Sequence, residues 1–546
     1  MSNNNVEVAV LDNAHVGDIK GAFGTIRYGD TAARQGWWPR LRTLLAILGP
    51  GLIVMVGDND AGGFSTYAQA GQNYGTGLLW TLVLLIPVLY VNQEMVLRLG
   101  AVTGVGHARL ILERFGRFWG AFSVIDLFVL NALTLVTEFI GISLALQFLG
   151  VSKLWGVVVA AILVMLAAST GDFRRFERFS MALVFASLLL VPLLVMVHPP
   201  LAQVAHGLLV PRLPGNAQLS DVMLLIIAVV GTTIAPWQLF FQQSYVIDKR
   251  LTPRFIRYGR VDLLLGIVLV MIGAIAIVAV CAATFVGQPE AGNFQDVGAV
   301  ATGLAKYHGH LSGVLFAIAL IDASLIGASA VSLSTAYAVA DVLSVKHSLH
   351  RKPTDAVAFY AVYFVLIAGA AALVLIPGVP LGLLTNAVQT LAGVLLPSAS
   401  VFLLLLCNDK EVLGPWINTR RTNLVTGVIV ALLVLLSVIL TAAVIWPDLS
   451  SRTIIDILVG GGIVGLGIVI AAHRQRSRTG VGIAVDQDRR EDADPDMLHA
   501  WRMPSLARLK PLVLSRSDRL WMGVLRSYLV IAVGLVVYKV IEVAAR

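Results

Sequence analysis

Twelve apolar runs follow one another along the chain, and each is about as long as a helix that crosses a membrane. A helix needs roughly 20 apolar residues to span the hydrocarbon core of a bilayer. The runs lie at 44–75, 77–98, 119–149, 154–170, 178–198, 221–247, 260–286, 311–342, 356–377, 380–406, 422–446 and 452–472. Only 13% of the 546 residues are charged, whereas about one-quarter are charged in soluble domains. We therefore expect an all-α polytopic membrane protein.

A thirteenth apolar run, at 521–543, leaves two alternatives open. Arg526, Lys539 and Glu542 interrupt it and shorten its uncharged core to Ser527–Tyr538. The segment 521–546 is therefore either a last span or a helix that lies at the membrane interface.

Positive charges gather in every second loop between the runs. The basic residues of these loops are Arg34, Arg40, Arg42, Arg109, Arg114, Arg117, Arg174, Arg175, Arg178, Lys249, Arg250, Arg254, Arg257, Arg260, Lys346, Arg351, Lys352, Lys410, Arg420 and Arg421. Cytoplasmic loops carry the excess of Lys and Arg. We expect a multi-pass protein of the bacterial inner (plasma) membrane, with a cytoplasmic N-terminus and the lipid bilayer as its surroundings. The loops account for the net charge of +8 without a nucleic-acid partner, because no nucleic-acid-reading motif accompanies it.

The segments outside the spans carry no recognisable catalytic motif. Residues 1–43 are polar, lack a signal peptide and are expected to be cytoplasmic. The stretch 473–520 mixes both charges and is expected to be a flexible cytoplasmic segment. Cys281 and Cys407 lie in apolar runs without metal-site or disulfide spacing, so we expect buried thiols.

Two of the apolar runs are interrupted by residues that break a helix. The first break is Gly57–Gly63, and the second is Gly231–Pro236. They occupy the first and sixth spans, which are equivalent positions of two five-span halves at 44–198 and 221–406. Paired breaks of this kind indicate a transporter built from inverted repeats, with its substrate at the mid-membrane breaks. The runs within 422–472 then add spans eleven and twelve.

The first break also contains two acids, Asp58 and Asp60. A lone carboxylate at this depth costs several kcal/mol unless a partner compensates it. Carboxylates beside unwound backbone carbonyls form a cation site, and they repel the carboxylate of an amino acid. The pattern therefore favours a metal-ion site.

At these positions the chain resembles the NRAMP family of divalent metal transporters. The likeness rests on Gly49-Pro50-Gly51, on the break ending at Asp60, and on the Ala235-Pro236 break. The resemblance implies a LeuT-type fold of two inverted five-helix repeats plus extra C-terminal helices, with an ion site between spans one and six.

The resemblance also implies roles for individual residues. In the first-span motif Asp-Pro-Gly-Asn, Asp60 matches the Asp ligand and Gly63 the Asn, while Asp58 is an additional acid. In the sixth-span motif Met-Pro-His, the matches are Ala235, Pro236 and Trp237.

Three further positions match the family outside these two motifs. Thr232 falls where the family offers a backbone carbonyl, and Gln389 resembles a glutamine that approaches the ion. Glu138 matches a glutamate of the proton route, but Leu135 stands where that route has an Asp. The predicted metal-ligating set is therefore Asp60, Thr232, Gln389 and Asp58.

The departures from the family pattern predict which ion is carried. Gly63 and Ala235 replace the Asn and Met ligands, so the site offers no sulfur for softer transition metals. Mg²⁺ is usually held by one or two carboxylates with several retained waters. The pattern resembles the NRAMP-related magnesium transporter branch, and Mn²⁺ would also fit. Since Leu135, Trp237 and an arginine-free ninth span replace the proton-route residues, we expect uptake of a hydrated ion without proton coupling.

Other polar residues at membrane depth are candidates with open alternatives. Asp322 is either functional or held by a structural hydrogen bond. Gln238, Gln242 and Asn386 are expected to face the ion pathway, and Trp237 either packs or walls the cavity. Glu94 either pairs with an arginine or lies at a cavity mouth, and for Asp126 a structural role is favoured.

Two other functions remain as alternatives. One is a proton-coupled Mn²⁺/Fe²⁺ transporter of the NRAMP type, and the other is a sodium-coupled organic-solute carrier on the same fold. An enzyme is not expected, because no His-Glu-x-x-His or nucleophile–base motif lies at membrane depth. We expect no catalytic residue, no cofactor and no required oligomer.

Overall fold

The computed structural model describes residues 11–215, 218–378, 381–445, 451–478 and 495–512, together with single positions between 523 and 534. Within the described helices, some side chains near 383–398, 443–445, 451 and 466–497 are also excluded, and that of Asn386 is one of them. Most of the predicted last apolar run, at 521–543, lies outside the described residues. Residues 479–494 and 513–520 of the charged stretch 473–520 also lie outside them.

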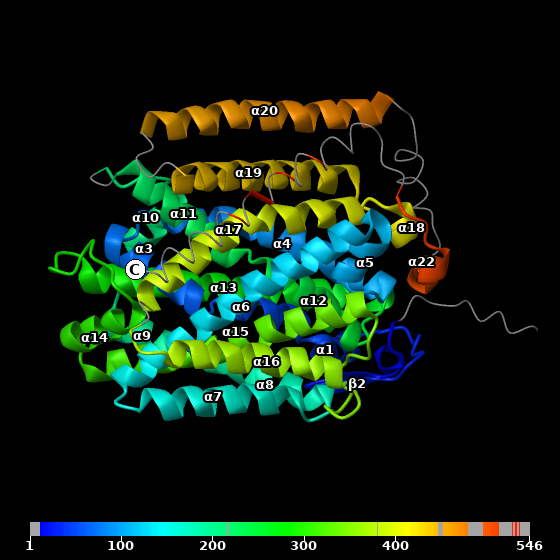
Figure 1. Cartoon of the computed structure of the whole chain (residues 1–546), viewed down its shortest axis with the longest axis horizontal. Coiled ribbons are helices and arrows are strands. Elements are labelled where there is room, and N and C mark those ends of the chain that lie inside the picture. Colours follow the sequence, from blue (N-terminus) through cyan, green and yellow to red (C-terminus); the bar gives the residue numbers. More distant parts are fainter. Residues whose placement is uncertain are drawn as a thin grey trace, which may run out of the picture.

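The described chain is a bundle of long helices whose axes run roughly alongside one another (Figure 1). Its long unbroken helices are α4 (Leu79–Thr103), α6 (Arg117–Phe148), α7 (Lys153–Ala168), α13 (Ile256–Phe285), α15 (His310–Leu343), α16 (Val357–Leu375), α17 (Leu381–Leu406), α19 (Arg420–Ile445) and α20 (Ser451–Arg478). Eight helices of the described part are long and apolar enough to cross a membrane, or nine if α1 and α2 are one bent span. The predicted all-α polytopic class is confirmed.

One further span, Phe173–Val197, consists of α8 (Phe173–Ala186), η2 (Ser187–Leu189) and α9 (Leu190–Val197). The remaining shorter elements are α5 (His107–Phe115), α10 (Leu201–Leu209), η3 (Pro253–Phe255), α14 (Val297–His308), α18 (Lys410–Leu413), η4 (Gly414–Trp416), α22 (Pro495–Ala500) and η5 (Leu506–Arg508). Helix α15 lies at the centre and packs against α6, α12, α14 and α16, while α20 is the outermost helix and lies on α19 (Figure 1).

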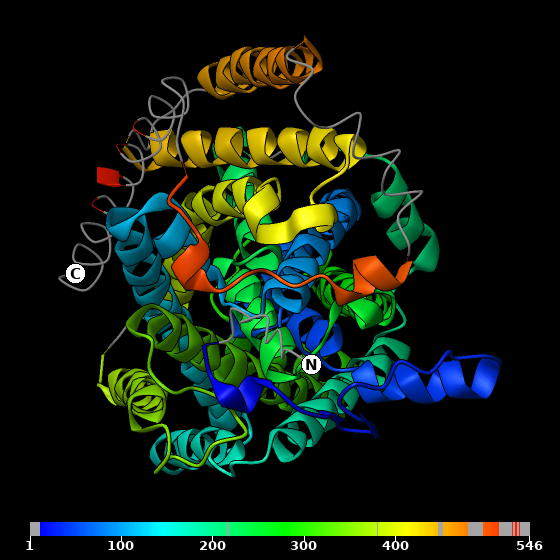
Figure 2. The same cartoon turned by 90° about the vertical axis from the view of Figure 1, so that its right-hand side faces the viewer.

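The first predicted span consists of three helices. Helix α1 (Trp37–Ile47) is bent by 52° from α2 (Pro50–Val56), and α3 (Ala61–Tyr74) follows the acidic break. Gly49 permits the bend because its φ of 151° is accessible to glycine, and Pro50 starts α2 at the position where proline is tolerated. The helical part of this segment begins at Trp37, before the start at 44 that the sequence predicted for the first span. Helix α1 projects sideways from the bundle (Figure 2).

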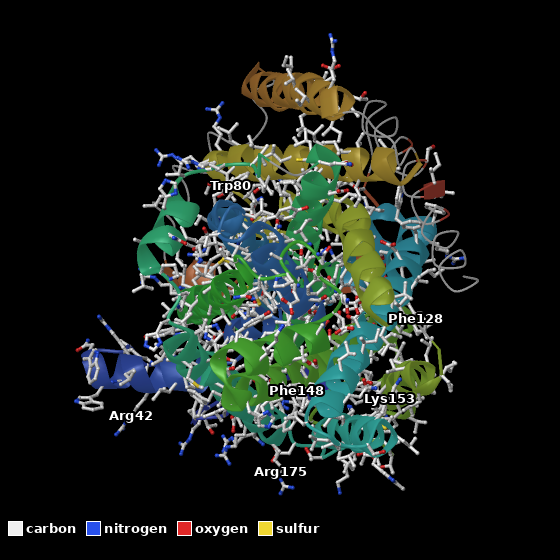
Figure 3. All side chains as sticks on the ribbon, turned by 90° about the vertical axis from the view of Figure 1, so that its left-hand side faces the viewer. Arg42, Trp80, Phe128, Phe148, Lys153 and Arg175 are labelled. Carbon is white, nitrogen blue, oxygen red and sulfur yellow. The ribbon has the colours of Figure 1, made fainter. Side chains whose placement is uncertain are left out.

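Helix α1 has the surface of a helix at a membrane interface. Trp37 and Trp38 are each 65% exposed, and such aromatic side chains are enriched where a bilayer meets water. Arg42 of α1 and Arg175 of α8 lie at the rim of the bundle and point away from it (Figure 3).

The sixth span is broken in the same way. Helix α11 (Leu219–Thr233) ends at the break and α12 (Pro236–Asp248) begins after it, with Pro236 at its first position. Both predicted breaks are thus present at the predicted residues. They place two helix ends and two helix starts inside the bundle.

The polar N-terminal segment is folded onto one end of the bundle. It contains η1 (Asn13–His15) and a hairpin of β1 (Ile19–Gly21) and β2 (Gly24–Ile26). The Asp12 carboxylate accepts hydrogen bonds from Arg351 Nε at 2.9 Å and from the His347 backbone amide at 2.9 Å. Although burial disfavours a charged imidazole, the Asp341 carboxylate facing His347 raises the pKa of His347 to about 9. Through Asp12, the N-terminal segment is therefore hydrogen bonded to the loop that follows α15.

Part of the charged stretch predicted to be flexible is packed as a strap, residues 495–512, across the end of the bundle that faces the viewer in Figure 2. Met503 is fully buried, and the backbone amide of Leu512 donates to the Arg114 carbonyl at 2.9 Å. Trp416 Nε1 donates to the Leu498 carbonyl at 3.2 Å. The prediction of flexibility was wrong for this part, because apolar side chains at intervals give it a face that packs.

Candidate metal site

Asp60 ends the first break and begins α3. Its carboxylate oxygen Oδ1 accepts a hydrogen bond from the Gly63 amide at 2.7 Å, so Asp60 is the N-cap of α3. The residue is 3% exposed. A Cβ added at Gly63 would lie 2.8 Å from the Asp58 carbonyl oxygen, so a glycine at this position allows the close turn. The negative carboxylate and the positive helix end stabilise each other, which orients Asp60 without a neighbouring cation.

Asp58 is fully buried two residues earlier and has a different environment. Its Oδ1 accepts a hydrogen bond from Gln238 Nε2 of α12, and its Oδ2 has no hydrogen-bond partner. Gln238 Oε1 in turn accepts from Gln93 Nε2 of α4 at 3.0 Å. The two breaks are therefore joined by a polar contact between Asp58 and Gln238.

Glu138 of α6 lies against the same break. Its Oε2 accepts a hydrogen bond from the Ala61 amide at 3.1 Å, so the Glu138 carboxylate lies beside Asp60 at the start of α3. Gly327 of α15 allows this approach, because a Cβ there would lie 2.7 Å from Glu138 Oε2 and 2.9 Å from the Asp60 Cβ.

The second break contributes backbone and hydroxyl groups. Thr232 and Thr233 end α11, and the Thr232 hydroxyl is buried without a partner. Tyr67 of α3 donates to Thr233 Oγ1 at 2.8 Å, since Thr233 itself donates to the Val229 carbonyl. Ala235 is the N-cap of α12 and adds no side-chain hydrogen bond. The break thus supplies oxygen atoms only.

Trp237 is buried and packs against the first break. A Cβ added at Gly57 would lie 3.6 Å from its ring atom Cη2. Its indole nitrogen has no hydrogen-bond partner, and its backbone carbonyl accepts from Ser334 at 2.9 Å. Trp237 therefore packs between the two breaks and also presents an unpaired donor there.

Gln389 of α17 reaches the first break, as predicted. A Cβ added at Gly62 would collide with the Gln389 amide, so this glycine permits the close approach. The amide nitrogen Nε2 is buried and has no partner. The helix position of Asn386 is described, but its side chain is outside the described residues.

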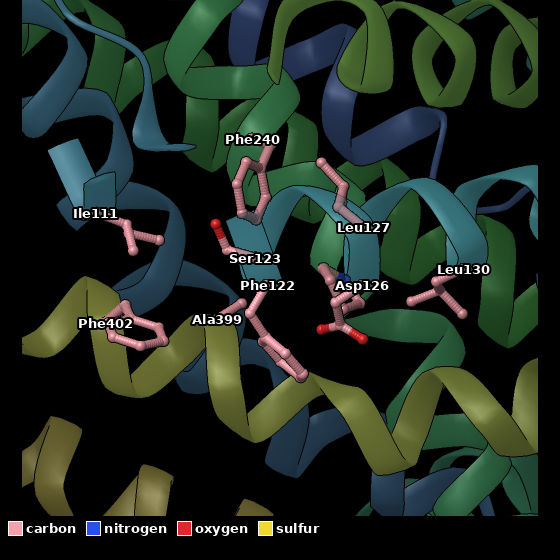
Figure 4. A pocket seen from close by; sticks show the side chains of 10 residues that line it. Ile111, Phe122, Ser123, Asp126, Leu127, Leu130, Phe240, Ala399 and Phe402 are labelled. Atoms are coloured by element: carbon pink, nitrogen blue, oxygen red, sulfur yellow. The ribbon is translucent and has the colours of Figure 1, made fainter. Parts of the chain in front are cut away.

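Three other polar residues had been left with open alternatives. Glu94 pairs with Arg98 at 3.1 Å and with Arg260 at 2.7 Å, so the predicted pairing with arginine is confirmed. Asp126 lines a small pocket between α5, α6, α12 and α17, and Pro236 of the second break also lines it (Figure 4). Asp322 of α15 is buried and has no hydrogen-bond partner for either oxygen.

Several buried polar residues near the breaks were not singled out by the sequence. Asn59 and Gln93 each have a side-chain oxygen without a partner, and Asn92 has neither amide atom paired. These residues could have been identified in the sequence as polar residues inside apolar runs. In the second apolar run, however, only the charged residue Glu94 was named as a candidate.

A polar stripe runs along one face of α12 from the break to its other end. Gln238, Gln242, Tyr245 and Lys249 follow one another at helical spacing. Both amide atoms of Gln242 and the hydroxyl of Tyr245 are buried without partners. Unsatisfied buried polar groups are rare in folded proteins, and water or an ion commonly satisfies those that occur.

The site in this conformation is closed and has no preformed ligand cage. Asp58, Asp60, Thr232 and Gln389 are each at most 3% exposed. No group of three His, Cys, Asp or Glu side chains within the described ranges is placed to hold a metal ion. The arrangement can offer a cation two carboxylates and amide and hydroxyl oxygens, but no sulfur.

Comparison with known proteins gives consistent matches. Residues 51–443 match the Nramp family model, described as natural resistance-associated macrophage protein-like. The chain is 29% identical over 420 residues to the divalent metal cation transporter MntH of Deinococcus radiodurans, covering 72% of this chain and 89% of that protein. It is 28% identical over 436 residues to MntH of Xylella fastidiosa, covering 76% and 89%.

The solved structures add the fold. A crystal structure of a mutant of the Eremococcus coleocola manganese transporter superimposes with a TM-score of 0.62 at 20% identity. The match covers 86% of this chain and 97% of that chain. The LeuT-type fold is therefore shared.

Proposed function

The chain belongs to the Nramp family, with its LeuT-type fold, and from this premise we propose that the divalent cation it carries is Mg²⁺, with Mn²⁺ as a second substrate. That the protein is a membrane transporter of divalent metal cations and not an enzyme follows from the family. The choice of ion and the absence of proton coupling are the proposal.

The donor chemistry of the breaks supports a hard cation. Residues 57–63 and 231–238 contain neither Met nor Cys, and Ala235 occupies the place of the family's thioether. Hard oxygen ligands suit Mg²⁺ and Mn²⁺, whereas sulfur selects softer metals. Asp58 adds a second carboxylate beside Asp60, which raises the attraction for a divalent ion that keeps its water.

The observation that carries the proposal is the set of buried polar atoms without a protein partner around the breaks. These atoms belong to Asp58, Asn59, Thr232, Trp237, Gln242 and Gln389. A water bound to the cation can donate to an unpaired carboxylate or amide oxygen and accept from an unpaired indole or amide hydrogen. Such a lining fits an ion that retains part of its hydration shell.

Transport without protons is supported by what surrounds the Asp60–Glu138 pair. Leu135 is buried in α6 where the family's route continues with an Asp, and α16 contains no charged residue. A proton that reached Asp60 or Glu138 would therefore have no next acceptor along this route. We propose that the membrane potential alone drives the ion, at roughly 4–5 kcal/mol per 100 mV for two charges.

We propose that the polar stripe on α12 is the path by which the ion leaves the central site. It leads from Gln238 at the break to Lys249 at the end of the helix, and its unpaired amide and hydroxyl groups would be satisfied by water. With the N-terminus in the cytoplasm of a bacterial inner membrane, as the basic loops predict, this end faces the cytoplasm. Inward transport then releases a hydrated ion along α12.

Reconstitution in liposomes tests the proposed function. We expect Mg²⁺ and Mn²⁺ influx that depends on an inside-negative potential and leaves the internal pH unchanged. Acidification that follows the metal would favour the proton-coupled alternative instead, which the Asp60–Glu138 contact would then explain. Mn²⁺ influx without Mg²⁺ influx would contradict the hydrated-ion proposal, and sodium-driven uptake of an organic solute would contradict the metal proposal altogether.

Restoring a thioether at the second break should change selectivity. We expect Ala235→Met to raise the apparent affinity for Cd²⁺ relative to Mg²⁺ by roughly tenfold, because a sulfur ligand favours the softer ion. Competition of Cd²⁺ with Mg²⁺ influx measures the ratio. Ala235→Leu is the matched control, since it adds similar volume without sulfur. An equal shift in both variants would show that size rather than sulfur is responsible.

A further inference from the structure

Asp322 is a buried carboxyl group outside the metal site. It lies in α15 about 18 Å along the helix axis from the start at His310. The residue is 5% exposed, and neither Oδ1 nor Oδ2 has a hydrogen-bond partner. The structural hydrogen bond that the sequence left open as an alternative is therefore absent.

No charged group compensates this carboxyl. The charged side chains and histidines on the elements packed against α15 are Asp60 before α3, Arg117, Asp126 and Glu138 on α6, Asp248 on α12, Lys306 and His308 on α14, Lys153 on α7, and the acids and bases of α5 and α8. On α15 itself they are His310 and Asp341. Within the described part of the chain, none of them hydrogen bonds to either oxygen of Asp322.

An unpaired carboxylate in such surroundings would cost several kcal/mol, whereas a neutral carboxylic acid costs far less. A metal ion would need several ligands, and the described residues form no group of three or more His, Cys, Asp or Glu side chains that could hold one. A proton needs one oxygen. We propose that Asp322 is a proton-binding site, distinct from the metal site, and that its proton is required for the closed conformation described here.

The position of Asp322 links its proton to opening of the transporter. One helical turn further on, Ile326 packs against the first break, where a Cβ at Gly57 would lie 3.0 Å from Ile326 Cγ2. When the break and α15 separate to admit an ion, water reaches this face of α15 and can solvate a carboxylate. Protonation then favours the closed conformation, and release of the proton favours the open one.

The sign of the pH dependence follows directly. At acid external pH Asp322 stays protonated, the closed conformation is favoured and metal uptake is slow. As the pH rises, the open conformation gains population by at most about tenfold per pH unit for one proton. The proton binds and leaves from the same side, so uptake depends on pH without carrying protons inward.

Uptake of Mn²⁺ by proteoliposomes, at fixed membrane potential and fixed internal pH, tests the proposal. The parent protein should take up Mn²⁺ faster as the external pH is raised from acid to neutral. Asp322→Asn, which is permanently neutral and of the same shape, should stay at the slow rate that the parent shows at acid pH. Asp221→Asn, which changes an exposed acid at the start of α11, should keep the parent profile.

A parent rate that does not change with pH would overturn the proposal, and so would an Asp322→Asn variant with the parent profile. Infrared spectroscopy supplies a readout that does not depend on transport or on which metal is carried. The absorption of buried protonated carboxyl groups should be weaker in Asp322→Asn than in the parent. Equal absorption in the two proteins would contradict a protonated Asp322, while leaving the proposed metal specificity untouched.

Discussion

Replacing Asp60 by Asn is expected to reduce metal uptake by roughly 100-fold or more. Removing one partner of a buried charge pair costs about 2–5 kcal/mol, and each 1.4 kcal/mol corresponds to a factor of ten in affinity. The substituted amide still has an oxygen that can accept from the Gly63 amide at the α3 start, now 2.7 Å from Asp60 Oδ1. The loss would therefore reflect the missing charge and not the missing helix cap.

Initial rates of Mg²⁺ and Mn²⁺ influx into proteoliposomes measure this effect. Asp60→Ala provides the comparison, because it removes both the charge and the cap, and loss of an N-cap costs about 1 kcal/mol of stability. The two variants should transport equally poorly, while only Asp60→Ala should unfold more readily. Uptake by Asp60→Asn at the parent rate would show that Asp60 is not the carboxylate that binds the ion.

The second large effect is expected at a buried ion pair far from the central breaks. Lys249 Nζ lies 2.6 Å from Glu177 Oε1 and also donates to the Leu48 carbonyl at 2.7 Å. Both side chains are completely buried. We expect Lys249→Met to destabilise the protein by about 3–5 kcal/mol, because it leaves the Glu177 charge buried without its partner.

Thermal unfolding in detergent, followed by circular dichroism, measures the loss of stability. The double variant Glu177→Gln with Lys249→Met is the matched control, since it removes both charges. It should recover most of the lost stability, because replacing a whole buried pair is often close to neutral. If the double variant is as unstable as Lys249→Met, the effect comes from lost packing or from the Leu48 contact instead.

This pair also shows where sequence reasoning stopped. Lys249 was expected in a cytoplasmic loop, as one of the basic residues that set the topology, yet its ion pair with Glu177 of α8 is completely buried. Asp262 of α13 completes the arrangement by accepting from the Gly49 and Gly51 amides at 3.0 and 2.6 Å. Charge counts identify which side of a membrane a loop occupies, but they cannot identify a partner 72 residues away in the chain.

The metal site was predictable to a similar extent. The breaks and their acids Asp58 and Asp60 could be located because glycine, proline and acids are conspicuous inside apolar runs, whereas Thr232 and Gln389 came from the resemblance to the family. The Asp58–Gln238 contact and the approach of Glu138 to Asp60 could not be predicted, since each depends on which faces of two helices meet. The burial of Asn92 and Gln242 without hydrogen-bond partners became visible only in the structure.

The sequence by itself determined the all-α membrane class, the two helix breaks and the absence of sulfur at these breaks. These properties follow from local composition, because a bilayer imposes one length and one hydrogen-bonding rule on every span. Tertiary structure alone decided that the strap 495–512 packs and that α1 turns sideways. The tertiary structure also decided that Asp322 has no hydrogen-bond partner. Contacts between distant helices depend on the shape and direction of their side chains, and these cannot be inferred from the composition of a single apolar run.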